Sequence, residues 1–199
     1  VNALAAAAIA RAHGVGWDAI RDGLARLPSL PGRIERIASG QPFTVIVDYA
    51  FEPVAMGTLY AVAKALPRRR TVQVLGTTGG GRDRDRGVVL GRMAGEFADL
   101  VVATDEDSYD DDPRLLAQRI VAGAQAAGKT LGRDLVRVLD RRQAIRYAVR
   151  AAKPGDLVLV TGKGSEQAMA VAGGKKIPWD DRVVVREELE AISAKPSLK

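Results

Sequence analysis

Short runs of β-branched and apolar residues alternate along most of this chain with longer segments of helical periodicity. The runs are almost continuously apolar, which is typical of strands in a parallel sheet, because crossover helices cover both faces of such a sheet. We therefore expect an α/β fold with a mostly parallel sheet of about six strands and helices on both faces. The predicted strands are Thr44–Asp48, Thr71–Leu75, Leu100–Thr104, Leu135–Leu139, Leu157–Thr161 and Val183–Val185. The predicted helices lie near 53–66, 88–98, 113–127 and 141–152.

Residues 1–30 precede this alternation and follow a different pattern. Asn2–His13 is rich in alanine and leucine, and Trp17–Leu27 repeats apolar residues on one helical face, so both segments predict helices. Pro28, Pro31 and Gly32 then interrupt the helical pattern. We expect a domain boundary there, with a short helical part at 1–30 and the main domain at 31–199.

The composition excludes several classes of protein. The 199 residues contain no cysteine and one histidine, His13, so a disulfide framework, a thiolate zinc site and a histidine metal cluster are excluded. No apolar run approaches the roughly 18 residues of a membrane-spanning helix, and no signal-peptide pattern opens the chain. We therefore expect a cytoplasmic protein with no membrane segment.

The net charge of +6 raises the question of nucleic acid. The basic residues do not cluster on one predicted helix, and no helix-turn-helix or aromatic RNA-binding motif accompanies them. We expect no nucleic-acid partner, and smaller anionic ligands fit the basic residues near the glycine-rich turns better.

Ligands of such sheets bind at the carboxyl ends of the strands, where the connecting loops gather. The loops that follow the predicted strands are therefore the candidates for chemistry. They comprise residues 48–53, 76–87, 105–113 and 162–166.

The loop at 76–87 combines glycines with alternating charges, a composition suited to holding a carboxylate or a phosphate. It is not a Walker A loop, because Arg82 and Asp83 follow Gly81 where that motif requires Lys and then Ser or Thr. The spaced glycines of a dinucleotide-binding turn are also absent. A flexible, solvated turn explains the spacing equally well.

The loop at 105–113 is strongly acidic, and Asp112 followed by Pro113 predicts a helix start. A solvated, helix-capping surface is favoured over calcium binding, because the Gly and Glu positions of an EF-hand are missing. In the loop at 162–166, Glu166 could bind an ammonium group while Arg84 binds a carboxylate. An exposed acid in a tight turn is the alternative, and spacing does not decide between them.

Five segments resemble, in order and spacing over about residues 31–189, the C-terminal domain of the Mur ligases. The resemblance is to those that add the third amino acid to UDP-N-acetylmuramoyl-L-alanyl-D-glutamate. The segments are Pro31–Glu35 (PGR-x-E in the family), Asp48–Ala50 with Pro53 (DYAHTP), Asp83–Gly87 (DRD-K/R-G), Gly162–Glu166 (GKGHE), and Asp180–Arg182 with Val185–Glu187 (DDR-x-x-x-RE).

This resemblance implies a Rossmann-like fold and an ATP-dependent, amide-bond-forming ligase of peptidoglycan biosynthesis. Asn2–Ala6 is similar to the last helices of the family's central ATPase domain, so residues 1–30 are expected to be an incomplete part of that domain. ATP and Mg²⁺ would then be bound mainly by the rest of the central domain. The chain alone is expected to be inactive, with no catalytic residue and no metal ligand of its own.

The implied partners are the UDP-MurNAc-dipeptide and a free amino acid. The resemblance also implies a role for each of seven residues. Arg33 and Asp48 would contact the ribose and adenine side of ATP. Arg84 would bind the amino acid's carboxylate, Gly162 and Glu166 would line its side-chain pocket, and Asp107 and Tyr109 would occupy the specificity loop.

Three positions depart from the family motifs. Phe51 and Ser165 replace the two motif histidines, so neither loop contains an imidazole. Tyr109 stands where diaminopimelate-adding members have the Arg of a DNPR motif. A second substrate carboxylate would then be buried without a cation, which costs several kcal/mol. Because the acidic loop attracts an ammonium group instead, we expect lysine or ornithine to be favoured over meso-diaminopimelate. The alternative is that Arg86 or Arg92 supplies the missing cation from a neighbouring loop.

Two other functions are compatible with the same sequence. One is another ligase of the superfamily, such as a folylpolyglutamate synthase or a cyanophycin synthetase, although the paired GKGSE and DRDRG motifs argue against both. The other is a non-catalytic nucleotide-binding module.

Overall fold

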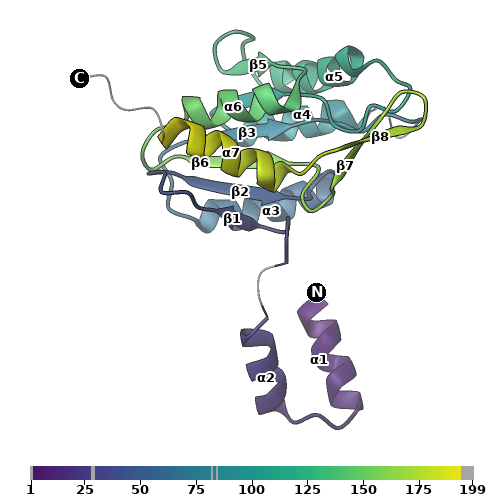
Figure 1. Ribbon diagram of the computed structural model, residues 1–199, viewed down its shortest axis with the longest axis vertical. Coiled ribbons are helices and arrows are strands. Elements are labelled where there is room, and N and C mark those ends of the chain that lie inside the picture. The colour runs from purple at the N-terminus through teal and green to yellow at the C-terminus, as the bar shows by residue number, and fades with distance from the viewer. Residues whose placement is uncertain (1, 28–29, 82, 84, 194–199) are drawn as a thin grey trace. The chain divides into compact units, whose positions relative to one another are not determined.

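The computed structural model describes residues 2–27, 30–81, 83 and 85–193, and the chain divides into two compact units, Val1–Leu30 and Pro31–Lys199. The first unit is a helical hairpin of α1 (Asn2–Ala12) and α2 (Trp17–Ala25) (Figure 1). Gly14 lies between the two helices with a φ of 82°, a conformation that glycine adopts without strain. Ile20 is the buried apolar residue of α2.

The second unit contains a six-stranded sheet in the order β1-β2-β6-β3-β4-β5. All neighbouring strands are parallel except β1, which pairs antiparallel with β2. The strands are β1 (Glu35–Ile37), β2 (Thr44–Asp48), β3 (Thr71–Leu75), β4 (Leu100–Ala103), β5 (Leu135–Arg137) and β6 (Leu157–Thr161). A separate antiparallel pair consists of β7 (Ala168–Val171) and β8 (Lys175–Pro178).

Helices cover both faces of the larger sheet (Figure 1). They are α3 (Pro53–Ala65), α4 (Arg86–Phe97), α5 (Pro113–Ala126), α6 (Arg141–Ala151) and α7 (Asp181–Ser193). One core lies under α3, α4 and α5, and a second lies under α6 and α7. Successive residues of a strand enter opposite cores, as Leu159 and Val160 do, because side chains alternate across a sheet. The predicted mostly parallel α/β fold is confirmed.

Aspartates mark the starts of two helices. Asp112 accepts a hydrogen bond from the Arg114 N–H at 2.8 Å, and Pro113 is the first residue of α5, as the sequence predicted. Asp140 caps α6 in the same way, through the Gln143 N–H at 2.8 Å. Both caps fix where the chain turns from a sheet-edge loop into a helix.

The predicted strand Val183–Val185 is wrong, because these residues lie within α7. The buried residues of this helix recur at intervals of three and four, which places them on one helical face. This pattern of burial outweighs the weak strand preference of three consecutive valines. The buried positions are Asp181, Val184, Val185, Glu188 and Leu189.

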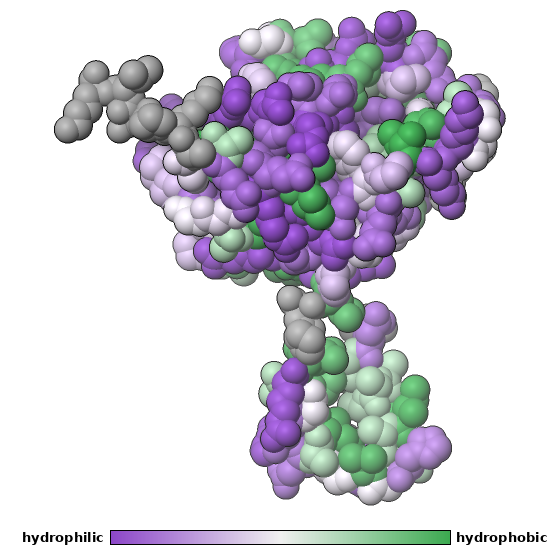
Figure 2. Space-filling model, in the orientation of Figure 1, coloured by the Kyte–Doolittle hydropathy of each residue, from purple (hydrophilic) through white to green (hydrophobic). Residues whose placement is uncertain are grey.

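The exposed surface of the second unit is largely hydrophilic on the face seen in Figure 2. Among the described residues, none of the helices combines the length and the apolar composition needed to cross a membrane.

Candidate functional site

The loops at the carboxyl ends of β2, β3, β4 and β6 surround a small pocket of about 60 Å³, here called the inner pocket. It is lined by Tyr49, Phe51, Thr78, Glu106, Asp107, Tyr109, Gly162 and Glu166. Four of the residues expected to bind substrate, Asp107, Tyr109, Gly162 and Glu166, therefore lie around one cavity.

A wider pocket of about 240 Å³ adjoins it, here called the outer pocket. Asp107, Tyr109 and Glu166 line both pockets, and Lys163 and the β7–β8 pair complete the outer one through Ala168, Ala170 and Lys176. The smaller sheet, which the sequence did not predict, thus extends the candidate site beyond the loops.

Lys163 lies between the acidic residues of the site. Its side chain is 1% exposed, and its Nζ donates to both carboxylate oxygens of Asp107 at 2.8 Å and to Glu166. Asp107 also accepts from the Ala170 N–H at 2.7 Å, which fastens β7 to the acidic loop. A buried ammonium needs such partners, because isolating the charge from water is costly.

Glu166 has a partner on each of its oxygens. Tyr49 donates its hydroxyl to Oε1 at 2.9 Å, and Lys163 donates to Oε2. Burial, reinforced by the hydrogen bond to Glu166, raises the pKa of Tyr49 to about 12, so the phenol remains a donor at neutral pH. Glu166 is thereby held in place at the pocket wall with its side chain still 37% exposed.

Glu106 is the most deeply buried carboxyl group of the inner pocket, at 3% exposure, and accepts from the Thr78 hydroxyl at 2.9 Å. Burial raises its pKa above the ordinary value of 4.5. Gly162 packs directly against it with a φ of 112°, and a Cβ at this position would lie 2.1 Å from Glu106 Oε2. Only glycine fits there, so Gly162 shapes the pocket through its lack of a side chain.

Backbone contacts hold Tyr109 in an unusual conformation. Its φ is 50°, a region that non-glycine residues rarely occupy, and its N–H donates to the Ala170 carbonyl at 3.1 Å. The ring lies over Gly80, where a Cβ would come within 3.0 Å of it. Asp111 accepts from the Gly80 N–H at 2.8 Å. The glycine-rich loop and the acidic loop therefore fit together around Tyr109.

The residues expected on the nucleotide side have a clear structural role. Asp48 accepts from the Ile34 N–H at 2.7 Å and from the Ala50 N–H at 2.8 Å, which joins residues 31–35 to the end of β2. Arg33 is exposed and stacks on the Tyr49 ring at 4.5 Å. The guanidinium of Arg33 therefore lies over a tyrosine that lines the inner pocket.

The segments that carry the family resemblance contact one another. Glu35 accepts from the Gly32 N–H at 2.7 Å and from Arg186 of α7 at 2.9 Å. Gly32 packs so closely on the 162–166 loop that a Cβ would lie 2.1 Å from the Ser165 nitrogen. Residues 31–35, the 162–166 loop and α7 thus contact one another although they lie far apart in the sequence.

Two buried arginines border this edge. Arg141 donates to the carbonyls of Thr161 and Asp105 at 2.8 and 3.2 Å and to both oxygens of Asp181 at 2.7 and 2.8 Å. Arg86 contacts Glu52 at 2.5 Å and lies over the Phe51 ring at 5.7 Å. Arg84, expected to bind the amino acid's carboxylate, lies outside the described residues.

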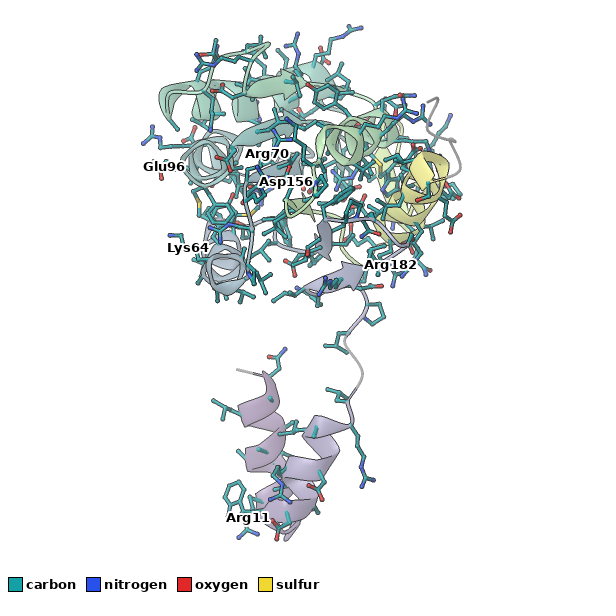
Figure 3. All side chains as sticks on the ribbon, turned by 90° about the vertical axis from the view of Figure 1, so that its left-hand side faces the viewer. Arg11, Lys64, Arg70, Glu96, Asp156 and Arg182 are labelled. Carbon is teal, nitrogen blue, oxygen red and sulfur yellow. The ribbon has the colours of Figure 1, made fainter. Side chains whose placement is uncertain are left out.

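The opposite edge of the sheet is closed by a different ion pair. Arg70 precedes β3, Asp156 precedes β6, and the two labelled side chains meet in Figure 3 with Nε and Oδ2 2.6 Å apart. Arg70 and Asp156 line neither of the two pockets described above. Within the described ranges, no group of three or more His, Asp or Glu side chains is arranged to hold a metal ion.

Sequence reasoning missed several pocket residues. Lys163 was noted only as part of the GKGSE motif, and its position directly after a buried strand was the available signal for burial. Glu106 and Thr78 carried no signal beyond their places in the correct loops. Lys176 lies in a strand that was not predicted.

Comparison with known proteins agrees with this architecture. The model of the family "Mur ligase, glutamate ligase domain" matches residues 32–164. The chain belongs to this family, and the resemblance inferred from the loop motifs is confirmed.

Individual relatives narrow the comparison. UDP-N-acetylmuramyl-tripeptide synthetase from Roseiflexus sp. (strain RS-1) is 42% identical over 94% of this chain and 36% of its own length. A relative from Alkaliphilus metalliredigens (strain QYMF), named UDP-N-acetylmuramoyl-L-alanyl-D-glutamate--2,6-diaminopimelate ligase, is 40% identical over 94% of this chain and 36% of its own length.

A solved structure of a UDP-N-acetylmuramoyl-L-alanyl-D-glutamate--2,6-diaminopimelate ligase superposes with a TM-score of 0.73 at 28% identity. The superposition covers 96% of this chain and 38% of that one. The chain thus spans about a third of the length of the curated relatives it matches.

Proposed function

We propose that this chain forms the C-terminal third of an ATP-dependent ligase that adds the third amino acid to UDP-N-acetylmuramoyl-L-alanyl-D-glutamate. The observation that carries the proposal is the inner pocket, which gathers Asp107, Tyr109, Gly162 and Glu166 at the carboxyl edge of the sheet. The relatives that match nearly all of the chain at 40–42% identity carry names of such ligases.

The amino acid that suits the inner pocket has a cationic side chain. Glu106, Asp107 and Glu166 contribute three carboxyl groups. Lys163, which lines the outer pocket, has a buried ammonium that is already paired with Asp107 and Glu166. Among the residues that the structure describes, no arginine or lysine directly lines this pocket. A substrate ammonium group would meet attraction there, whereas a second carboxylate would meet repulsion. This arrangement supports lysine or ornithine over meso-diaminopimelate.

In this ligase, the chain's own residues bind and orient the amino acid so that its free amine attacks the activated carboxyl group of the UDP-MurNAc-dipeptide. Glu166 and Gly162 bound the side-chain pocket, Asp107 and Tyr109 set specificity, and Arg84 binds the α-carboxylate. Holding an amine in an attack geometry replaces a bimolecular encounter by an effectively unimolecular step.

The nucleotide side of the proposal uses Arg33 and Asp48. Arg33 is exposed and its guanidinium lies over the Tyr49 ring, which suits contact with a ribose or base. Two backbone N–H groups orient Asp48. ATP supplies the energy for carboxyl activation when bound. As the family resemblance implies, Mg²⁺ would be bound mainly by the remainder of the ligase.

A competition assay tests the proposal. The ligase that carries this chain is given lysine, ornithine and meso-diaminopimelate at equal concentration, with ATP and the UDP-MurNAc-dipeptide. We expect lysine or ornithine to dominate the product, and Tyr109→Arg to move the preference toward meso-diaminopimelate by about tenfold, or about 1.4 kcal/mol. Tyr147→Arg, at an exposed tyrosine on α6, is the matched control and should leave the preference unchanged.

Preferential incorporation of meso-diaminopimelate by the unaltered ligase would overturn the specificity assignment. Lys176 of the outer pocket would then be the first candidate partner for the extra carboxylate. Nucleotide binding without ligation of any amino acid would favour the non-catalytic module instead.

A further inference from the structure

Arg86 is a buried arginine, and some of the N–H donors of its guanidinium have no hydrogen-bond acceptor among the described residues. The residue is 5% exposed, and its Nη1 donates to Glu52 at 2.5 Å. Its Nε and Nη2 are also buried, and neither has a hydrogen-bond partner among the residues that the structure describes. Buried charged donors without acceptors are destabilising, so such an arrangement calls for an explanation.

The two atoms without partners form one edge of the guanidinium. Their N–H bonds point in parallel and match the two oxygens of a carboxylate. Arg141, Arg146 and Arg182 each present this Nε–Nη2 edge to a carboxylate of the protein, with distances of 2.6 to 2.9 Å. In Arg86 the same edge is empty.

Arg86 lies next to a residue that lines the inner pocket. The guanidinium lies over the ring of Phe51, which lines that pocket, and Arg86 is the first residue of α4. The N-cap residue of this helix, Asp85, makes no capping hydrogen bond through its side chain. The N-terminus of a helix carries partial positive charge, which favours an anion at the same place.

We propose that the Nε–Nη2 edge of Arg86 binds the α-carboxylate of the incoming amino acid. The inference rests on the proposed function, since it takes the inner pocket to be the amino-acid site. A carboxylate has acceptor positions for more than one donor, so this role is compatible with the one that the family resemblance implies for Arg84. Arg86 is therefore a second substrate-binding arginine that the family resemblance did not assign.

Glu52 explains why the ligand is a carboxylate and not a phosphate. It lies against Arg86 with a side chain that is 47% exposed, and it already supplies one negative charge. A monoanionic carboxylate adds one more charge, whereas a phosphate dianion adds two beside Glu52. The planar carboxylate also matches the edge in shape, as the internal arginine–carboxylate pairs do.

The test observes the side-chain Nε–Hε signals of arginine by NMR in the ¹⁵N-labelled 199-residue chain. The Arg86 signal is identified by its loss in Arg86→Lys. Three probes are titrated: L-lysine, cadaverine, which is lysine without its carboxylate, and inorganic phosphate. We expect L-lysine to shift the Arg86 signal and the other two probes to leave it in place.

Three variants test whether Arg86 itself determines the affinity for L-lysine. Arg86→Lys should weaken L-lysine binding about tenfold, because a lysine ammonium cannot form the paired bonds. Arg146→Lys is the matched control, since Arg146 uses the same edge on Glu188, and it should not change the affinity. Glu52→Gln should strengthen L-lysine binding, because it removes the negative charge that competes for Arg86.

A shift with phosphate but not with L-lysine would overturn the proposal in favour of a phosphate ligand. No shift with L-lysine, or an unchanged affinity in Arg86→Lys, would reduce Arg86 to a structural partner of Glu52. The inference is separable from the proposed substrate: a ligase that prefers meso-diaminopimelate, with an Arg86 signal that this amino acid shifts, refutes the lysine or ornithine assignment and keeps the role of Arg86.

Discussion

Arg141 and Arg86 are both buried, at 2% and 5% exposure, yet their surroundings differ in one respect. Arg141 is surrounded by acceptors: its guanidinium binds both oxygens of Asp181 and the carbonyls of Thr161 and Asp105. Arg86 has one acceptor, on Glu52, and keeps two N–H groups without partners among the described residues. The hydrogen bonds of Arg141 are made within the fold, whereas the Nε–Nη2 edge of Arg86 is available to a ligand under our proposal.

The two arginines serve different parts of the same edge. Arg141 joins the ends of β4 and β6 to the start of α7, so it fixes the loops that bear Glu106, Asp107 and Lys163. Arg86 lies on Phe51 at the pocket wall. A buried ion pair complete in itself rigidifies a site, whereas an incomplete one costs stability that a bound ligand restores.

Breaking the Arg141 pair should have the largest effect. Asp181→Ala leaves a buried guanidinium without its carboxylate and also removes the acceptor of Trp179 Nε1. We expect the free energy of unfolding, measured by urea denaturation, to fall by about 3–5 kcal/mol. Glu187→Ala is the matched control, because it breaks the exposed pair with Arg142 and should cost less than about 1 kcal/mol. Equal losses in the two variants would show that burial does not distinguish them.

Glu106 is expected to make a smaller contribution to the free energy of unfolding, and this contribution depends on pH. Burial raises the pKa of Glu106 in the folded chain, so the folded state retains a proton that the unfolded state releases above about pH 4.5. The contribution of Glu106 is therefore most favourable below pH 4.5 and is lost as pH rises through its folded pKa. Glu106→Gln removes this dependence and still accepts from Thr78.

The measurement is the difference in unfolding free energy between Glu106→Gln and the unaltered chain from pH 4 to pH 8. We expect the variant to gain stability relative to the unaltered chain as pH rises. A difference that stays constant with pH would contradict the raised pKa of Glu106.

Much of the sheet could be predicted from the sequence, because five of its strands are short apolar runs whose burial follows from local composition. Thr44–Asp48, Thr71–Leu75 and Leu157–Thr161 were predicted with the observed bounds. The edge strand β1 has three residues and little composition signal, and β7 and β8 depend on pairing with each other. Val183–Val185 was misassigned because strand preference was weighed without the helical spacing of its buried neighbours.

The candidate site also has features that the sequence could predict and features that it could not. The convergence of the loops follows from parallel topology, so the membership of Asp107, Gly162 and Glu166 in one cavity was foreseeable. The burial of Lys163 was not, since its partner Asp107 lies 56 residues away in sequence. The burial and contacts of Arg86 could not be predicted either, because Glu52 and Phe51 come from another loop. Ion pairs between residues far apart in the sequence cannot be predicted from the local composition.

The central claim is that Arg86 is kept for a ligand and not for the fold, and the unfolding free energy of Arg86→Met tests it most directly. Methionine preserves much of the apolar stem over Phe51 and removes the two donors that lack partners. We expect urea denaturation to give a value within about 1 kcal/mol of the unaltered chain, or a higher one. A loss of about 3 kcal/mol or more, comparable to that expected for Asp181→Ala, would show that Arg86 serves the fold as Arg141 does.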